Sequence, residues 1–191
     1  MSAEPQSTAA FKLGRLEGKV AIVTGGASEL GFGAAISRRF VEEGCKVVIG
    51  DLDEEGAKNV AQKMDSPNVK GIKMNVCEET DWKNVVEYAV QEFGRLDIVV
   101  NNAGTTYRNK PTAEVTDEEW ERVFKVNVKS IFWSAKIVIP QLQKQKSGGS
   151  VINISSTGSI RPRPGLVWYN ASKGAVSNVS FSELTSERKP S

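Results

Sequence analysis

The sequence of 191 residues has no histidine, only two cysteines and no long apolar run. Without histidine, imidazole-based catalytic triads and histidine metal sites are excluded, and we expect no metal. Cys45 and Cys77 form no CxxC pair, so we expect reduced packing residues in an intracellular, cytoplasmic protein. No segment approaches the roughly 20 apolar residues that a membrane-spanning helix needs. The sequence therefore predicts no membrane partner.

Charge of neither sign is in excess. The chain has 25 Lys and Arg against 23 Asp and Glu, for a net charge of +2. This interspersed balance gives no reason to expect a nucleic acid as a partner. The length and the 39% hydrophobic content suit one globular domain with its own core. We expect a loose tail over residues 1–15, which lack an apolar signal segment, and a single domain over 16–191.

Short apolar runs alternate with amphipathic helical segments. We expect strands at Val20–Val23, Val47–Ile49, Val69–Met74, Leu96–Val100 and Ser150–Ile154. We expect helices over 34–43, 54–64, 80–93 and 116–143, and a last helix from about 167. The strands are continuous apolar runs, which is typical of parallel strands buried on both faces. The predicted fold class is α/β, a three-layer, doubly wound parallel sheet of the Rossmann type.

The first predicted strand runs into a glycine-rich turn, Thr24-Gly25-Gly26-Ala27-Ser28-Glu29-Leu30-Gly31-Phe32-Gly33, that opens a helix. A helix N-terminus points free N–H groups at an anion, and glycines let the backbone approach a pyrophosphate. Asp51 ends the second strand, where a carboxylate can accept hydrogen bonds from a ribose. A 2′-phosphate would meet a like charge there, so we favour NAD over NADP. The alternatives are a turn without a ligand and a solvated Asp51.

Three motifs stand out in the sequence: Thr24-Gly25 with Gly31 and Gly33, then Asn101-Asn102-Ala103-Gly104, and Tyr169-Asn170-Ala171-Ser172-Lys173. Together they resemble the short-chain dehydrogenase/reductase family. The resemblance runs from about Leu16 to about Val179. It implies an NAD(P)-dependent oxidoreductase that interconverts an alcohol and a ketone by hydride transfer. The implied partner is a small-molecule substrate, and the family often pairs its long helices between subunits, so a homo-oligomer is an expectation.

The resemblance also implies a role for each matching position. Tyr169 would be the general acid/base, and Lys173 would hold the nicotinamide ribose and lower the pKa of the tyrosine. Ser156 would hydrogen-bond the substrate, and Asn127 would hold a water of the proton relay. The implied cofactor-binding residues are Thr24, Gly25, Ser28, Gly31, Phe32, Gly33, Asp51, Asn75, Asn102, Ala103, Gly104, Tyr169 and Lys173.

Elementary chemistry supports the tyrosine–lysine pair without the family. Tyr169 and Lys173 are four residues apart, so they share one face of a helix. A phenol titrates near pH ~10, and a neighbouring ammonium favours its ionised form. Structural alternatives remain open: packing for the tyrosine, a solvated charge for the lysine, and Ser155 or Ser159 in place of Ser156.

The sequence departs from the family's TGxxxGxG pattern in the turn. If Gly31 and Gly33 are the last two glycines, Glu29-Leu30 is a two-residue insertion, and otherwise Glu29 replaces the middle glycine. Either alignment puts a carboxylate near the pyrophosphate site, where like charges ~4 Å apart cost about 4 kcal/mol at an effective dielectric of 20. We expect the loop to turn Glu29 outward.

The resemblance fades after about Val179, although family members continue through further strands. The predicted fold therefore lacks the last strands of the family, and its fifth strand is an uncovered sheet edge. This leaves an alternative function: a catalytically inactive, truncated fragment that binds a dinucleotide or a protein partner.

Overall fold

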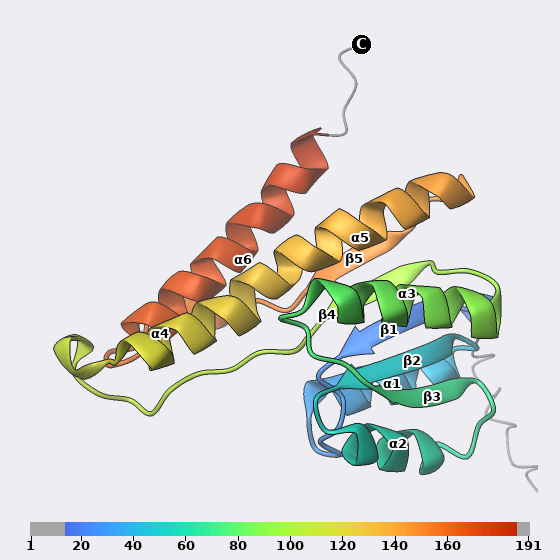
Figure 1. Ribbon diagram of the computed structural model, residues 1–191, viewed down its shortest axis with the longest axis horizontal. Coiled ribbons are helices and arrows are strands. Elements are labelled where there is room, and N and C mark those ends of the chain that lie inside the picture. Colours follow the sequence, from blue (N-terminus) through green and yellow to red (C-terminus); the bar gives the residue numbers. More distant parts are fainter. Residues whose placement is uncertain (1–13, 187–191) are drawn as a thin grey trace, which may run out of the picture.

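A parallel sheet of five strands organises the computed structural model, which describes the backbone of residues 14–186 and the side chains of residues 14–180. The strands are β1 (Val20–Thr24), β2 (Lys46–Asp51), β3 (Val69–Lys73), β4 (Ile98–Asn101) and β5 (Ser150–Asn153). They lie in the order β3-β2-β1-β4-β5, and each neighbouring pair is parallel (Figure 1). The predicted doubly wound α/β fold is confirmed. Most of the predicted tail, residues 1–13, lies outside the described residues.

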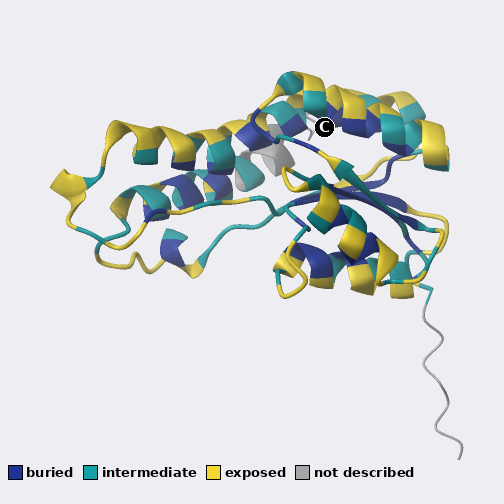
Figure 2. Ribbon diagram, turned by 60° about the horizontal axis from the view of Figure 1, so that its bottom comes forward, coloured by how far each residue is buried: buried dark blue, intermediate teal, exposed yellow. Residues whose placement is uncertain are grey.

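Helices cover both faces of this sheet. They are α1 (Phe32–Glu42), α2 (Glu54–Gln62), α3 (Glu79–Phe93), α4 (Asp117–Phe124), α5 (Ser130–Gln145) and α6 (Val167–Ser186). Successive residues of a strand point to opposite faces. In β1, Ala21 and Val23 therefore pack with α1 and α2, whereas Val20 and Ile22 pack with α3 and α5. Figure 2 shows the buried sides of the helices turned toward the sheet.

The long helix expected over 116–143 is interrupted. Its start is as predicted: the Thr116 hydroxyl accepts from the backbone N–H of Glu119, and the Glu119 carboxylate accepts from the N–H of Thr116. A π-helical turn, Lys125–Lys129, then separates α4 from α5. The expectation of one continuous α-helix is wrong here, because a π turn takes up an additional residue while keeping the apolar side inward.

Helix α1 begins at Phe32, two residues before the predicted start. Gly31 is the N-cap, with extended backbone angles and no side-chain cap. Pattern analysis missed these two residues because Phe32 is exposed and Gly33 carries no side chain. No helix in the described part of the chain is long and apolar enough to cross a membrane. Both cysteines are buried and free.

The two edges of the sheet differ in character. In the part of the chain that the structure describes, β3 and β5 are the outermost strands. β3 carries the polar side chains of Lys70 and Lys73, whereas β5 exposes Ile152 over 42% of its surface. The expectation of an uncovered edge at the fifth strand is met within these residues.

Candidate active site

A cavity of about 560 Å³ opens at the carboxyl ends of the strands. Of the predicted cofactor-binding residues it is lined by Gly25, Gly31, Phe32, Asp51, Asn75, Asn102, Ala103 and Gly104. Sequence reasoning missed the lining residues Gly50, Leu52, Met74, Val76, Cys77, Thr105, Arg122 and Val126. A signal for some of them was present, because the segment 74–77 directly follows β3 and ligands bind outside the carboxyl ends of parallel strands.

The turn between β1 and α1 is built for close approach. Gly25 has φ +72°, and a Cβ on it would lie 2.7 Å from the Ala103 Cα atom. A Cβ on Gly33 would lie 2.4 Å from the carbonyl oxygen of Gly25, so helix α1 packs directly on the turn. The first turn of α1 has neither an acidic residue nor a side-chain cap. Its N–H groups are thus available to an anion.

Asp51 holds its carboxylate at the cavity wall. Its Oδ2 atom accepts from the N–H of Ala27 at 3.0 Å, and its Oδ1 atom accepts from the N–H of Asp53 at 3.0 Å. An ionised carboxylate has about four acceptor positions, so two remain for the hydroxyls of a ribose. Asn75 lies beside it, with Oδ1 accepting from the N–H of Cys77 at 3.0 Å.

Thr24 and Asn102 join the ends of β1 and β4. The Thr24 side chain is 0% exposed, and its hydroxyl accepts from the backbone N–H groups of Asn102 and Ala103, both at 3.1 Å. The Asn102 amide donates to the carbonyls of Thr24 and Gly25 at 2.8 and 2.9 Å. Thr24 therefore lies beneath the cavity and not in its wall, where it positions the two turns.

Ser28, Glu29 and Leu30 form the outer side of the glycine turn. Ser28 and Leu30 are exposed, and the Ser28 carbonyl accepts from the N–H of Gly31 at 2.9 Å. The Glu29 carboxylate pairs with the ammonium of Lys63, at the end of α2. The expectation that Glu29 turns outward is confirmed. Ser28 and Gly33 do not line the cavity.

Asn127 sits in the π turn and is only 2% exposed. Its Oδ1 atom accepts from the N–H of Thr105 at 2.8 Å, and its Nδ2 atom donates to the Thr105 carbonyl at 2.9 Å. The second Nδ2 hydrogen goes to the Ser172 hydroxyl at 3.0 Å. Both amide donors are therefore used, and this side chain can offer a water only the remaining lone pair of Oδ1.

Lys173 is a buried cation, 6% exposed, on α6. Its Nζ atom donates to the Ile154 carbonyl at 2.7 Å, and within the described residues no carboxylate pairs with it. Burial lowers the pKa of Lys173 below its ordinary value. An ammonium has three donors, so two remain for a ligand or for Tyr169. A buried charge without a counter-charge is costly, so Lys173 is a candidate site residue.

Asn127 and Lys173 converge on Gly104, at the end of the cavity. A Cβ on Gly104 would lie 3.4 Å from the Asn127 Oδ1 atom and 3.5 Å from the Lys173 Nζ atom. The glycine turn, Asp51 and Gly104 all line the cavity. Asn127 and Lys173 do not line it themselves but lie behind Gly104. A dinucleotide is a ligand long enough to contact both the glycine turn and Gly104.

The three serines that competed for one role differ in their contacts. The Ser155 hydroxyl donates to the Lys173 carbonyl at 3.0 Å and lies 2.6 Å from the Ser177 hydroxyl. The Ser159 hydroxyl donates to the Ser156 carbonyl at 2.6 Å. The Ser156 hydroxyl accepts from the N–H of Gly158 at 3.1 Å, which leaves its own proton for a substrate. These contacts favour Ser156.

Tyr169 lies half-buried in the first turn of α6, one helical turn before Lys173. The start of this helix is fixed by Tyr107, whose buried hydroxyl accepts from the N–H of Trp168 at 3.1 Å. A backbone hydrogen bond also joins two loops here, because the N–H of Lys110 donates to the carbonyl of Gly165 at 3.2 Å. The loops before α4 and before α6 are thus joined on the tyrosine side of the site.

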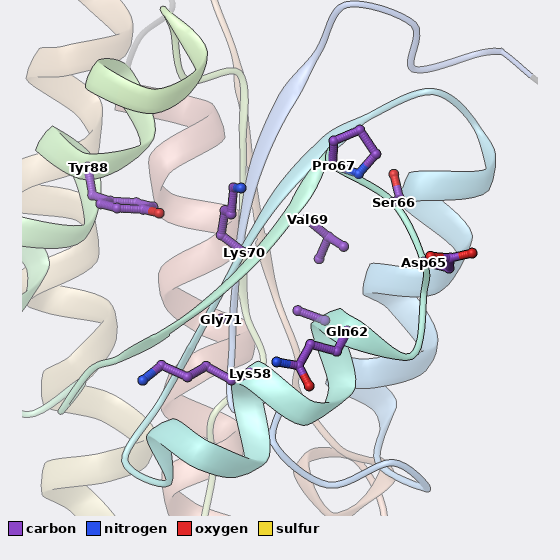
Figure 3. A pocket seen from close by; sticks show the side chains of 10 residues that line it. Lys58, Gln62, Asp65, Ser66, Pro67, Val69, Lys70, Gly71 and Tyr88 are labelled. Atoms are coloured by element: carbon purple, nitrogen blue, oxygen red, sulfur yellow. The ribbon is translucent and has the colours of Figure 1, made fainter.

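A second hollow of about 460 Å³ lies apart from these residues, between α2, the connection to β3 and Tyr88 of α3 (Figure 3). It contains none of the predicted site residues. Its two lysines are already paired with carboxylates, Lys58 with Glu54 at 2.8 Å and Lys70 with Glu92 at 3.5 Å. The cavity at the carboxyl ends of the strands is therefore the candidate active site.

A family model described as short chain dehydrogenase matches residues 19–189 of the chain. The chain belongs to the short-chain dehydrogenase family. Its strand order and the position of its cavity agree with this membership.

Two curated relatives show how much of a short-chain dehydrogenase is present. The chain is 46% identical over 167 residues to 4-formylbenzenesulfonate dehydrogenase from Comamonas testosteroni, covering 86% of this chain and 65% of the relative. It is 38% identical over 164 residues to a 3-oxoacyl-acyl-carrier-protein reductase from Thermotoga maritima, covering 85% and 65%. The chain thus spans about two thirds of the length of the curated relatives it matches.

Two solved structures have the same fold as this chain. A 3-ketoacyl-(acyl-carrier-protein) reductase from Brucella melitensis, complexed with NADH, matches with a TM-score of 0.84 and 38% identity over 88% of this chain and 69% of that chain. A short-chain dehydrogenase/reductase from Burkholderia phymatum, in complex with NAD, matches with a TM-score of 0.86 and 27% identity over 91% and 61%.

Proposed function

We propose that this protein is an NAD-dependent oxidoreductase that interconverts an alcohol and a ketone, with Tyr169 as the general acid/base. The observation that carries the proposal is the convergence of Asn127 and Lys173 on Gly104, at the end of a cavity that also holds Asp51. These two buried polar groups are far apart in the sequence, and the fold places both beside Gly104. Lys173 has no counter-charge among the described side chains, so a ligand is the natural partner for its free donors.

The residues present fit a nicotinamide dinucleotide from end to end. Asp51 would accept from the adenosine ribose, the N-terminus of α1 would bind the diphosphate, and Lys173 would donate to the nicotinamide ribose. Two similar structures carry NADH and NAD, although an alcohol dehydrogenase from Lentilactobacillus kefiri, 38% identical, is named NADP-dependent. NAD is favoured for this chain because Asp51 would face a 2′-phosphate.

The residue proposed for proton transfer, Tyr169, lies on α6 together with Lys173. When bound, the nicotinamide ring would accept a hydride from the alcohol carbon or return one to the ketone. In the oxidative direction Tyr169 would take the hydroxyl proton, with Ser156 donating to the substrate oxygen. Asn127 holds Thr105 and Ser172, and so fixes the loop and the helix that flank this point.

The test compares wild type with Tyr169→Phe. Binding of NADH is measured by calorimetric titration, and turnover is followed by nucleotide absorbance with simple secondary alcohols and ketones. General acid–base catalysis contributes roughly 100- to 10,000-fold, so turnover should fall by that factor while NADH affinity changes little. Equal turnover in the two proteins would contradict the role of Tyr169. Binding without turnover in the wild type would instead support the inactive, dinucleotide-binding alternative.

We also propose that two copies of the chain associate through their long helices. The exposed aromatic residues Trp120 and Phe132 lie on α4 and α5, where a second copy could cover them. Sedimentation of the purified protein tests this, with a single monomeric species as the contrary result.

A further inference from the structure

One ion pair joins the glycine turn to the end of helix α2. Glu29 lies two residues before Gly31, the N-cap of α1, and Lys63 is the C-cap of α2. Their side chains pair across 34 residues of sequence and are 51% and 60% exposed. Exposed pairs contribute little to folding stability, so stability alone does not explain this contact.

The position of Glu29 makes its charge important. The N-terminus of α1 has no side-chain cap and no acidic residue in its first turn. A free carboxylate close to such a terminus is attracted to its N–H groups, as a phosphate is. Glu29 would therefore compete for the same groups and repel an incoming phosphate. In the structure the Glu29 carboxylate instead pairs with Lys63 at the end of α2.

Lys63 is well placed to hold this carboxylate. It ends α2, where the partial negative charge of the helix terminus favours a cation. α2 itself is fixed, because the Asp53 side chain caps its start by accepting from the N–H of Gly56 at 3.0 Å. Lys63 therefore directly follows a capped helix, and its ammonium lies beside the glycine turn.

We propose that Lys63 holds Glu29 away from the N-terminus of α1 and neutralises its charge, which keeps that terminus open to the diphosphate of a dinucleotide. The inference rests on the proposed function for its ligand. It makes Lys63 a positioning residue, because Lys63 acts through Glu29. In either alignment of the turn with the family pattern, the pair compensates for the carboxylate that Glu29 places there.

A double-mutant cycle tests this, with calorimetric titration of NADH and, separately, of inorganic pyrophosphate. Lys63→Gln should weaken both ligands about tenfold, which corresponds to about 1.4 kcal/mol. Glu29→Gln should bind at least as tightly as wild type, and the double variant should bind like Glu29→Gln. The effect of Lys63→Gln should shrink at high salt, because both side chains are exposed.

Lys58→Gln is the matched control. Lys58 is also on α2 but pairs with Glu54 and Glu55 of the same helix, so its loss removes an equal charge without freeing the turn. Its NADH affinity should stay within about twofold of wild type, since distant exposed charges are screened. Circular dichroism checks that every variant is folded.

The outcomes separate the two proposals. If Lys63→Gln binds like wild type, or the double variant binds as weakly as Lys63→Gln, the role of Lys63 through Glu29 is refuted. If pyrophosphate follows the expected order but NADH does not bind at all, the inference stands and the dinucleotide function fails. If wild type binds neither ligand, both are overturned.

Discussion

At the scale of single residues, Lys173 differs from the packing residues that surround it. Its ammonium is buried on α6 with one carbonyl partner, and the described residues supply no carboxylate to it. Such an arrangement is poor for folding and useful for chemistry. The same contrast holds for Asn127, a buried amide whose donors are spent on one loop and one helix.

The lowered pKa of Lys173 predicts how stability changes with pH. Between its folded pKa and the ordinary value of 10.5, the unfolded chain binds more protons than the folded chain, so folding stability rises with pH. Relative to Lys173→Met, wild type should therefore gain free energy of unfolding as the pH rises from 7 toward 10. Urea unfolding at several pH values measures this, and a pH-independent difference would contradict it.

Gly33 predicts a steric effect at a single position. A Cβ on Gly33 would lie 2.4 Å from the Gly25 carbonyl oxygen, so Gly33→Ala should cost about 1–3 kcal/mol of stability through overpacking. Gly174→Ala is the matched control, because nothing lies within 4 Å of a Cβ there. That change in α6 should stabilise by about 0.5–1 kcal/mol. Chemical denaturation measures both, and equal effects would refute the packing argument.

At the scale of elements, the residue that follows α1 binds the first residues that the structure describes. Glu43 is nearly fully buried, and its carboxylate accepts from the N–H groups of Gly14 and Arg15 at 3.1 and 3.2 Å. These backbone hydrogen bonds, with the Arg15 guanidinium, lower the pKa of Glu43 to about 2. This interaction fastens the segment before β1 to helix α1.

The lowered pKa of Glu43 predicts an acid transition. Its stabilising contribution is complete above the ordinary value of 4.5 and is lost as the pH falls toward about 2. Glu43→Gln should be less stable than wild type at pH 7, and its stability should fall less steeply between pH 4.5 and 2. Glu42→Gln, on the exposed side of the same turn, is the control and should keep the wild-type slope. Thermal unfolding across this range decides it.

Elements and site were predictable to different degrees. The apolar runs that became β1 to β5 and the helix start at Thr116 are local signals, and both predictions are confirmed. The π turn at Lys125–Lys129 was missed because one additional residue leaves the apolar pattern of the helix nearly unchanged. The glycine turn and Asp51 were predicted from the residues themselves, and Asn75 and Asn102 from the resemblance, whereas Arg122 and Val126 had no local signal. Their place depends on how the sheet brings distant loops together.

At the scale of the whole molecule, the edges of the sheet predict association. β5 exposes Ile152, whereas β3 carries Lys73, and edge lysines oppose pairing between chains. Ile152→Lys should reduce aggregation severalfold, and the reciprocal change Lys73→Ile should increase it. Light scattering on warming measures both, with circular dichroism to check the fold. No change in either variant would mean that aggregation starts elsewhere.

The hydroxyl of Thr24 has a consequence for the whole cavity. It joins the ends of β1 and β4, and so links the glycine turn directly to the segment after β4. The binding site of a ligand that contacts both segments is therefore already formed, and few loops need to become ordered when the ligand binds. Association should then lose little conformational entropy, and the measured heat capacity change should follow the area of apolar surface covered and not a folding transition.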